Sequence, residues 1–351
     1  MICAQGARQG LHAKSVTIVL IAVLLAAGAS AQAGPSDDPM GYFNLYSLGD
    51  IGTPGSAYQG EVIGVAGAGG NVWFSSALHG RNSPTGYALH AGGSAVLSGT
   101  YLNSLEIGGN ASLGNAGIAG SVVTGGDVSS FGPCAIGGDV LAAGSVSLTG
   151  EMAIEGRTVS GAAFSPMADH AALSEFFVGK SQEIGSLADT GGWTEDWDAV
   201  RFEGAGGVNV ITVDAATLKD ATSVTIVAPE DAVVYINVLD AHVELDWTAW
   251  RYEGGVEAAD VLLNLANATS LDLSGTNAVN ILAPFADTVF ADGVLAGNLV
   301  VSNLEGSGQI NPGSFEHMGP VPEPATWMLL LVLAVPILAR RSRRARAGAH
   351  A

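Results

Sequence analysis

The sequence is poor in charged residues, in cysteines and in aromatic residues. Of its 351 residues 13% are charged and 7% are aromatic, and the two cysteines are Cys3 and Cys134. A typical globular protein has roughly 25% charged residues, so the composition excludes a charge-rich disordered chain. Only 13 residues are Lys or Arg, against 33 Asp and Glu. Because phosphate binding needs clustered basic side chains, this balance argues against a nucleic-acid partner.

Glycine, in contrast, is abundant, and the charge is unevenly distributed. The 49 glycines are unfavourable in helix interiors, which favours a β-rich protein with many tight turns over a mainly helical one. All 33 acidic residues lie between Asp37 and Glu323 together with only six basic residues, so this central region carries a net charge of −27. The other seven cations lie in the termini, a segregation that predicts targeting segments around an acidic body.

Residues 1–33 have the pattern of a secretory signal peptide. Arg8 and Lys14 precede the apolar run Val16–Ala27, and small residues suited to an A-x-A cleavage site follow. The alternative is a buried core helix. Export through the Sec machinery would remove Cys3, leaving Cys134 as the only cysteine and the mature chain without an internal disulfide.

Residues 320–351 have the pattern of a stop-transfer segment. A Pro-Glu-Pro triplet within residues 321–326 precedes an apolar stretch at 326–339 and an arginine-rich tail at 340–346. The apolar stretch predicts a membrane helix, and the arginines predict a cytoplasmic end. The stretch is shorter than the roughly 20 residues of a stable span, which suits a temporary anchor. The tail cations are Arg340, Arg341, Arg343 and Arg344.

This tail closely resembles the PEP-CTERM sorting signal of Gram-negative bacteria, which has the same three parts in the same order. The resemblance implies recognition by an exosortase, a membrane-embedded cysteine protease, at Pro322, Glu323 and Pro324. It also implies an exported surface or matrix protein associated with exopolysaccharide or other surface proteins. The precursor would be anchored in the inner membrane, and the mature form would lie at the cell surface or outer membrane or in the extracellular matrix.

Residues 60–160 contain a loose repeat in which Gly-Gly and a small polar residue precede an alternating apolar stretch. Its Gly-Gly pairs begin at residues 69, 92, 108, 125 and 137, spaced by 23, 16, 17 and 12 residues. Units this short favour a mainly β protein, a right-handed parallel β-helix or solenoid with coils of unequal length. The glycines are expected at corners that need positive φ. An antiparallel sandwich with glycine-rich hairpins is the alternative.

One helical insertion interrupts the strand pattern at about residues 165–188. Ser165 at the N-cap and Pro166 at N1 predict its start. Because Gly179 weakens the helical pattern, the sequence is compatible with either one helix or two short helices. Its expected role is to cover apolar surface of the solenoid.

A second internal repeat follows the helix, because Ala228-Pro229 and Ala283-Pro284 each end an apolar run. Proline cannot donate to a strand ladder, so both should mark strand exits or corners. Strands are expected at Val208–Val213, Val224–Val227, Val233–Val238, Val261–Leu265, Val279–Leu282 and Leu299–Val301.

A second resemblance covers residues 41–317. The opening Phe43–Asp50, the Gly-Gly-Asn-Val element at 69–72 and the segment Asn280–Phe315 are similar to the choice-of-anchor A family of bacterial surface proteins. The resemblance implies a β-helical adhesin domain, at residues 34–319, between the signal peptide and the sorting signal. The family has no established catalytic residues.

No sequence motif for catalysis or cofactor binding is present. G-x-S-x-G, Walker A and G-x-G-x-x-G patterns are absent, and no histidines have zinc-ligand spacing. We therefore expect no enzyme, no catalytic residue and no cofactor.

Two weaker signals remain, acidic clusters and tryptophans. Glu195, Asp196 and Asp198 could ligate Ca²⁺, helped by Asp127 and Asp139 at Gly-Gly corners, although solvated carboxylates are the simpler interpretation. Aromatic residues could stack on sugar rings or simply pack in the core. They are Trp193, Trp197, Trp247, Trp250 and Tyr252.

Three function classes remain, and an adhesive or matrix-structural protein is the first. A polysaccharide-active enzyme, a β-helical lyase or hydrolase, is the second, although six scattered cations argue against it. An ice-binding solenoid is the third, and the absence of any Thr-x-Thr pair argues against that class.

Overall fold

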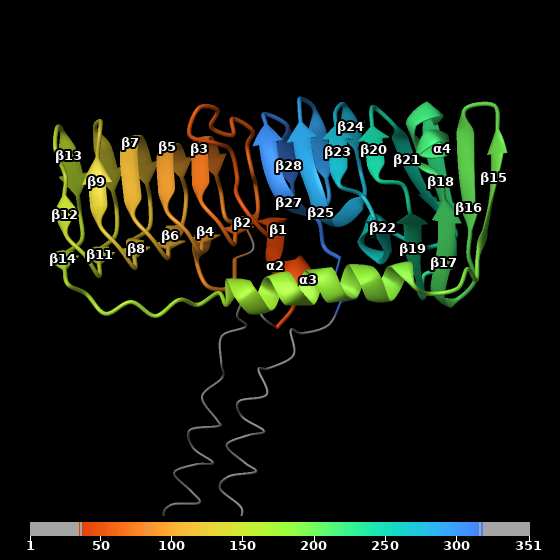
Figure 1. Cartoon of the computed structure of the whole chain (residues 1–351), viewed down its shortest axis with the longest axis horizontal. Coiled ribbons are helices and arrows are strands. Elements are labelled where there is room, and N and C mark those ends of the chain that lie inside the picture. The colour runs from red at the N-terminus through yellow and green to blue at the C-terminus, as the bar shows by residue number, and fades with distance from the viewer. Residues whose placement is uncertain (1–34, 36, 82, 316, 319–351) are drawn as a thin grey trace, which may run out of the picture.

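The computed structural model describes residues 35, 37–81, 83–315 and 317–318. In this part of the chain the protein is mainly β with long parallel sheets, an arrangement compatible with the expected solenoid (Figure 1). The antiparallel sandwich is wrong, because β15 and β16 are the only described strands that pair antiparallel. No helix in the same part is long and apolar enough to span a membrane. The expected signal peptide at 1–33 and membrane helix at 326–339 lie outside the described residues.

The first arm, residues 43–160, begins in the middle of the molecule and stacks outward to one end (Figure 1). Each strand pairs in parallel with the equivalent strand of the preceding coil. The elements of this part are α2 (Pro39–Tyr42), β1 (Phe43–Ser47), β2 (Val65–Ala68), β3 (Val72–Leu78), β4 (Tyr87–Ala91), β5 (Ala95–Tyr101), β6 (Ser104–Ile107), β7 (Ala111–Ile118), β8 (Val122–Thr124), β9 (Val128–Ser130), β10 (Cys134–Ile136), β11 (Val140–Ala142), β12 (Val146–Ser147), β13 (Met152–Ile154) and β14 (Thr158–Ser160).

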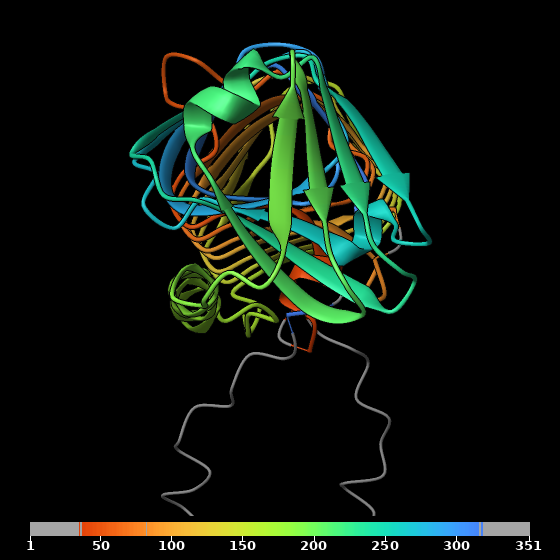
Figure 2. The same ribbon diagram turned by 90° about the vertical axis from the view of Figure 1, so that its right-hand side faces the viewer.

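Helix α3 (His170–Gly185) then runs back along the flank, and the second arm, residues 192–311, stacks from the far end toward the middle (Figure 1). Seen along the long axis, α3 lies outside the strands (Figure 2). The remaining elements are β15 (Gly192–Asp196), β16 (Ala199–Glu203), β17 (Gly207–Val213), α4 (Ala215–Asp220), β18 (Ser223–Val227), β19 (Ala232–Val238), β20 (His242–Leu245), β21 (Ala249–Glu253), η1 (Ala258–Asp260), β22 (Val261–Asn264), β23 (Ser270–Leu273), β24 (Thr276–Asn277), β25 (Asn280–Phe290), β26 (Val294–Ala296), β27 (Leu299–Gly306) and β28 (Gln309–Asn311).

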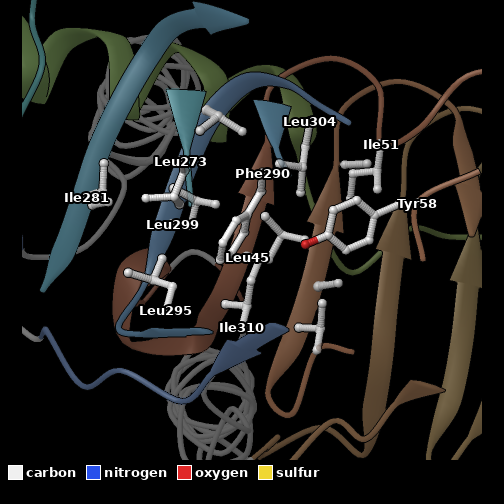
Figure 3. Close-up of a cluster of buried hydrophobic side chains, with 14 of the residues drawn as sticks. Leu45, Ile51, Tyr58, Leu273, Ile281, Phe290, Leu295, Leu299, Leu304 and Ile310 are labelled. Carbon is white, nitrogen blue, oxygen red and sulfur yellow. The ribbon is translucent and has the colours of Figure 1, made fainter. Parts of the chain in front are cut away.

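The two arms join in the middle, where β1 pairs in parallel with β27. Leu45 lies opposite Leu299, and the core runs through this junction without interruption. Figure 3 shows Leu45 and Leu299 together with Tyr58, Phe290 and Ile310 in one buried cluster. The largest sheet therefore has the strand order β14-β11-β8-β6-β4-β2-β1-β27-β25-β22-β19-β17. The chain begins and ends its described part near this junction.

The glycines of the Gly-Gly repeat do not have the expected positive φ; none of them is among the glycines in that conformation. Close approach between coils explains them instead. A Cβ at Gly108 would lie 2.3 Å from the carbonyl oxygen of Gly92, and a Cβ at Gly125 would lie 2.2 Å from that of Gly108. A side chain at either position would therefore push neighbouring coils apart.

The small polar residue after each pair forms a ladder along the stack. Asn71 Oδ1 accepts a hydrogen bond from the Ser94 N–H at 3.0 Å, and Asn110 Oδ1 accepts one from Asp127 N–H at 2.8 Å. Asp139 belongs to a second ladder, in which its own N–H donates to Ser121 Oγ at 2.9 Å. This second corner explains the irregular spacing of 12 residues in the repeat.

Helix α3 is a single helix, but it begins at His170 and not at Ser165–Pro166. Asp169 is its N-cap, since its Oδ1 accepts a hydrogen bond from the N–H of Ala172 at 3.1 Å. Its apolar side chains cover the outer face of the largest sheet, as expected from the sequence. Gly179 is accommodated within the helix. Two further short α-helices, α2 and α4, and the 3-10 turn η1 were not expected.

The strands expected in the second arm are present, with one correction. Pro229 follows the end of β18, as expected of a strand exit, whereas Pro284 lies inside β25. The pairing register of β25 with β27 shifts between Ala283 and Asp287. The strand thus turns a corner at this proline without ending.

Candidate functional site

One sheet face of the first arm has only small or uncharged side chains at its outward positions. Pairing aligns these positions in two rows that cross neighbouring coils, and we call them together the small-residue face. One row is Ala77, Thr100, Gly117, Ala135 and Ala153, and the other is Trp73, Val96, Ser112, Ser129 and Ser147.

Alternation along the strands turns these rows outward. Leu97, Tyr101 and Cys134 point into the core and are buried, whereas Thr100 and Ala135 are exposed. No atom lies within 4 Å of the position that a Cβ would take at Gly117, so the surface is open there. Paired strands are about 4.8 Å apart, and the rows therefore repeat at that interval.

The chemistry of this face suits contact with an extended surface. Its two rows carry no charge in a chain of net charge −20, so covering them requires no charge desolvation. Glu151 and Glu155 border the rows only at the outermost coil. Alanine and glycine have no rotamer freedom to lose, and the strands beneath are pinned by the core. Such a face is ordered before it binds, which lowers the cost of association.

The second arm is much more acidic than the first. The first arm has seven acidic and two basic residues, a net charge of −5, and the second has eighteen acidic and three basic residues, a net charge of −15. One outward row of the second arm aligns Glu244, Asp272, Val289 and Glu305 across four strands. Several of the cations are paired, as in Lys219 with Glu244 and Arg157 with Asp139.

A buried group of ionisable residues lies beneath the start of α3. His90 Nε2 lies 2.7 Å from the hydroxyl of Tyr42, and His90 Nδ1 lies 3.4 Å from Glu106 Oε1, outside hydrogen-bond geometry. The Glu106 carboxylate accepts the N–H of Met167 at 3.1 Å. His170 Nδ1 is 3.1 Å from the hydroxyl of Tyr46. These contacts tie the linker before α3 to the sheet.

Burial and neighbouring groups shift the pKa values in this group. Burial raises the pKa of Glu106, but His90 and the N–H groups of Met167 and Ala168 outweigh burial and hold it below 4.5. Burial, aided by nearby His90, lowers the pKa of His170 to about 4. His170 is therefore neutral at physiological pH. The sequence offered no motif for this group, because Tyr42, Tyr46, His90, Glu106 and His170 come from five separate elements.

The middle of α3 is held by a buried amide network. Asn264 Oδ1 accepts the Ser181 hydroxyl at 2.7 Å, and Asn264 Nδ2 donates to Ser181 O at 3.0 Å and to Asn237 Oδ1 at 2.8 Å. Asn237 Nδ2 donates to Ile184 O at 3.1 Å. This network is structural, since all of its side chains are buried.

The residues proposed as calcium ligands lie around one hairpin at the far end. Glu195 and Asp196 belong to β15, and Asp198 lies in the turn before β16. Among the described residues, no group of three or more His, Cys, Asp or Glu side chains is placed to hold a metal ion. Asp127 and Asp139 accept hydrogen bonds from the next coil, Asp127 from Ser145 at 2.6 Å and Asp139 from Arg157 at 2.8 Å.

The aromatic residues divide into two groups. Trp193, Trp250 and Tyr252 pack against the core, and each donates a hydrogen bond to the chain around it. Trp197 and Trp247 are exposed, by 90% and 63% respectively. Core packing thus accounts for the first group, and only the second is free to stack on a ligand.

The remaining predicted site residues lie outside the described residues. They are Pro322, Glu323 and Pro324 of the sorting signal, and Arg340, Arg341, Arg343 and Arg344 of the tail. Sequence reasoning missed the small-residue face. A signal was present, because Thr100, Gly117, Ala135 and Ala153 recur at intervals of 17 to 18 residues.

Comparison with known protein families shows which family this domain resembles. The model of the family described as "Putative Ice-binding-like adhesive domain" matches residues 36–312. No curated protein and no solved structure matches the chain significantly.

Proposed function

Because this chain belongs to the family of ice-binding-like adhesive domains, we propose that it is an exported surface protein that adheres through its small-residue face. The observation that carries the proposal is the pair of outward rows that includes Thr100, Ala135 and Ser129. They form an ordered, uncharged surface on an otherwise acidic body. Such a surface contacts a polymer without the repulsion that the second arm would produce.

Export and anchoring are part of the same proposal. The signal peptide at 1–33 directs the chain to Sec, and an exosortase reads Pro322, Glu323 and Pro324 after the membrane helix has inserted. The mature protein then acts at the cell surface or in the matrix, with exopolysaccharide as its contact. The domain has no enzymatic role in this proposal.

Binding to the exopolysaccharide of the producing cells tests the adhesive role. The double variant Thr100→Glu, Ala135→Glu adds two charges to the face, and burying them against a polymer is unfavourable. We expect binding to weaken about tenfold, equivalent to about 1.4 kcal/mol. Ala199→Glu, at an exposed outward position of β16, is the matched control and should bind as the unchanged protein does. Equal binding by all three proteins would contradict the proposal.

Ice binding is a second candidate, favoured by the regular interval of the two rows. Thermal hysteresis and the shape of growing ice crystals test it directly. Activity that is lost in the double variant and kept in Ala199→Glu would assign the same face to ice. Release of reducing sugars from the polysaccharide would instead support the enzymatic alternative.

A further inference from the structure

No element in the described part of the chain covers the outermost coil of the first arm. Strands β12, β13 and β14 each pair on one side only among the described strands. Their inward side chains, such as Met152 and Ile154, are half-buried, whereas the equivalent Cys134 and Ile136 one coil earlier are 5% and 1% exposed. We call this coil the open end.

The opposite end of the molecule is covered by the chain itself. The segment 189–196 folds over β17, and the N–H groups of Thr190 and Gly191 donate to Val210 O at 2.8 and 3.1 Å. Trp193 Nε1 donates to Thr212 O at 3.1 Å, and Ile211 beneath is only 2% exposed. One end therefore has the cap that stacked repeats need, and the other lacks it.

The shape of the open end indicates what kind of partner can cover it. Three unpaired strand edges surround an apolar centre that includes Val146 and Leu148. A single extended peptide would pair with one edge and leave the other two edges and the centre in water. A coil of the same outline covers all three edges at once, and a second copy of this chain supplies such a coil.

The difference in net charge between the two arms indicates how the second copy is oriented. The first arm carries −5 and the second −15, so contact between an open end and a second arm would bring acidic surfaces together. Contact between two open ends places the acidic arms at the far ends of the pair. The rim of the open end carries Glu151, Glu155 and Arg157, charges of both signs.

We propose that two copies of this chain associate end to end through their open ends, in a two-fold symmetric pair. Symmetry of this kind uses the same surface on both subunits. The contact continues the stack of strands across the pair and removes the exposed edges. It does not depend on what the small-residue face binds.

Cross-linking from a single introduced cysteine tests the pair in the full chain. Ser147→Cys places a thiol at the open end and Ala199→Cys places one at the capped end, each in a Cys3→Ser background. Cys134 is buried, and the background protein without an added cysteine controls for it. Each variant is purified free of polysaccharide, because Ser147 also belongs to the small-residue face, and is treated with a flexible bis-maleimide. The products are separated by denaturing electrophoresis and weighed by mass spectrometry.

A covalent dimer from Ser147→Cys, at least fivefold more abundant than from Ala199→Cys, supports the proposal. Equal dimer from both variants, or more from Ala199→Cys, overturns it. A Ser147→Cys protein that reacts with maleimide but stays monomeric also overturns it. Failure of the cysteine at 147 to react with maleimide also overturns the proposal, because another segment of the chain would then cover the open end.

Discussion

His90 and Glu106 lie opposite each other on the adjacent strands β4 and β6, and both are buried beneath the start of α3. Glu106 also accepts the Met167 N–H, so one carboxylate joins a sheet of the first arm to the linker that leads to the second arm. The docking of α3 is therefore coupled to the ionised state of the Glu106 carboxylate. Burial raises the pKa of this group, but it lies below its ordinary value because His90 and the N–H groups of Met167 and Ala168 favour the charged form.

We expect the thermal unfolding midpoint to fall as the pH falls from 6.5 toward 4. The folded pKa of His170 is lowered from 6.5 to about 4, so the unfolded chain takes up a proton in this window and the folded chain does not. The stability lost is roughly 3 kcal/mol at most. Loss from Glu106 begins only below its ordinary pKa of 4.5, as the carboxylate protonates. His170→Gln should flatten the upper part of the profile, and the exposed His242→Gln should not. An unchanged slope in His170→Gln would contradict this assignment.

We expect Gly125→Ala to destabilise the protein by about 1–3 kcal/mol, because the added Cβ would overlap the carbonyl of Gly108. Gly117→Ala is the matched control, since its Cβ meets no atom, and it should stay within about 0.5 kcal/mol of the unchanged protein. Denaturant unfolding measures both. Similar losses at both positions would mean that close approach is not the reason for the repeat glycines.

We expect Asn264→Ala to lower the free energy of unfolding by about 1–3 kcal/mol, because Ser181 and Asn237 would lose buried partners. Limited proteolysis should also cut α3 sooner. Asn267→Ala, which removes one exposed hydrogen bond to Leu239 O, serves as the control. If α3 is cut at the same rate in both variants, the network does not hold the helix.

Changing Pro322, Glu323 and Pro324 to alanines should leave membrane insertion intact and block processing. The apolar stretch and the tail arginines are untouched, so the physical basis of insertion remains. Pulse labelling and fractionation measure maturation. Removing Arg340, Arg341, Arg343 and Arg344 instead should disturb retention at the membrane. Maturation of the alanine variant at the normal rate would reject the sorting signal.

Calcium should raise the unfolding midpoint only modestly, and magnesium should match it at equal ionic strength. The acidic second arm is stabilised by screening of like charges, which does not distinguish the two ions. A calcium-specific rise at micromolar concentration would contradict this expectation. It would point to Glu195, Asp196 and Asp198 as ligands, with binding to the folded state adding stability.

Short-range patterns made much of each arm predictable. The polar residues after the Gly-Gly pairs, such as Asn71 and Asn110, bond to the coil directly above, so the repeat in the sequence reflects contacts between neighbours in the stack. The helix position was predictable from its apolar residues. Its start was not, because the cap at Asp169 competes with the equally plausible Ser165–Pro166.

The small-residue face and the buried group at Glu106 were not predictable. The face depends on which side of each short strand turns inward, and a one-residue change of register would reverse it. The buried group depends on the linker before α3 meeting β6, where the Met167 N–H donates to Glu106, and no local pattern specifies this contact. His90 in isolation has nothing in its neighbouring residues that marks it as buried.

The sequence by itself determined the β-rich class, the short stacked coils and the acidic balance, because each follows from composition or from contacts between neighbouring repeats. Only the tertiary structure decided that the chain starts in the middle, returns along α3 and closes with β27 beside β1. That closure joins Leu45 to Leu299, residues far apart in the chain, and its free energy comes from burying one continuous core. The same closure leaves one end capped and the other open, since residues 37–318, as far as they are described, pass over only one of them.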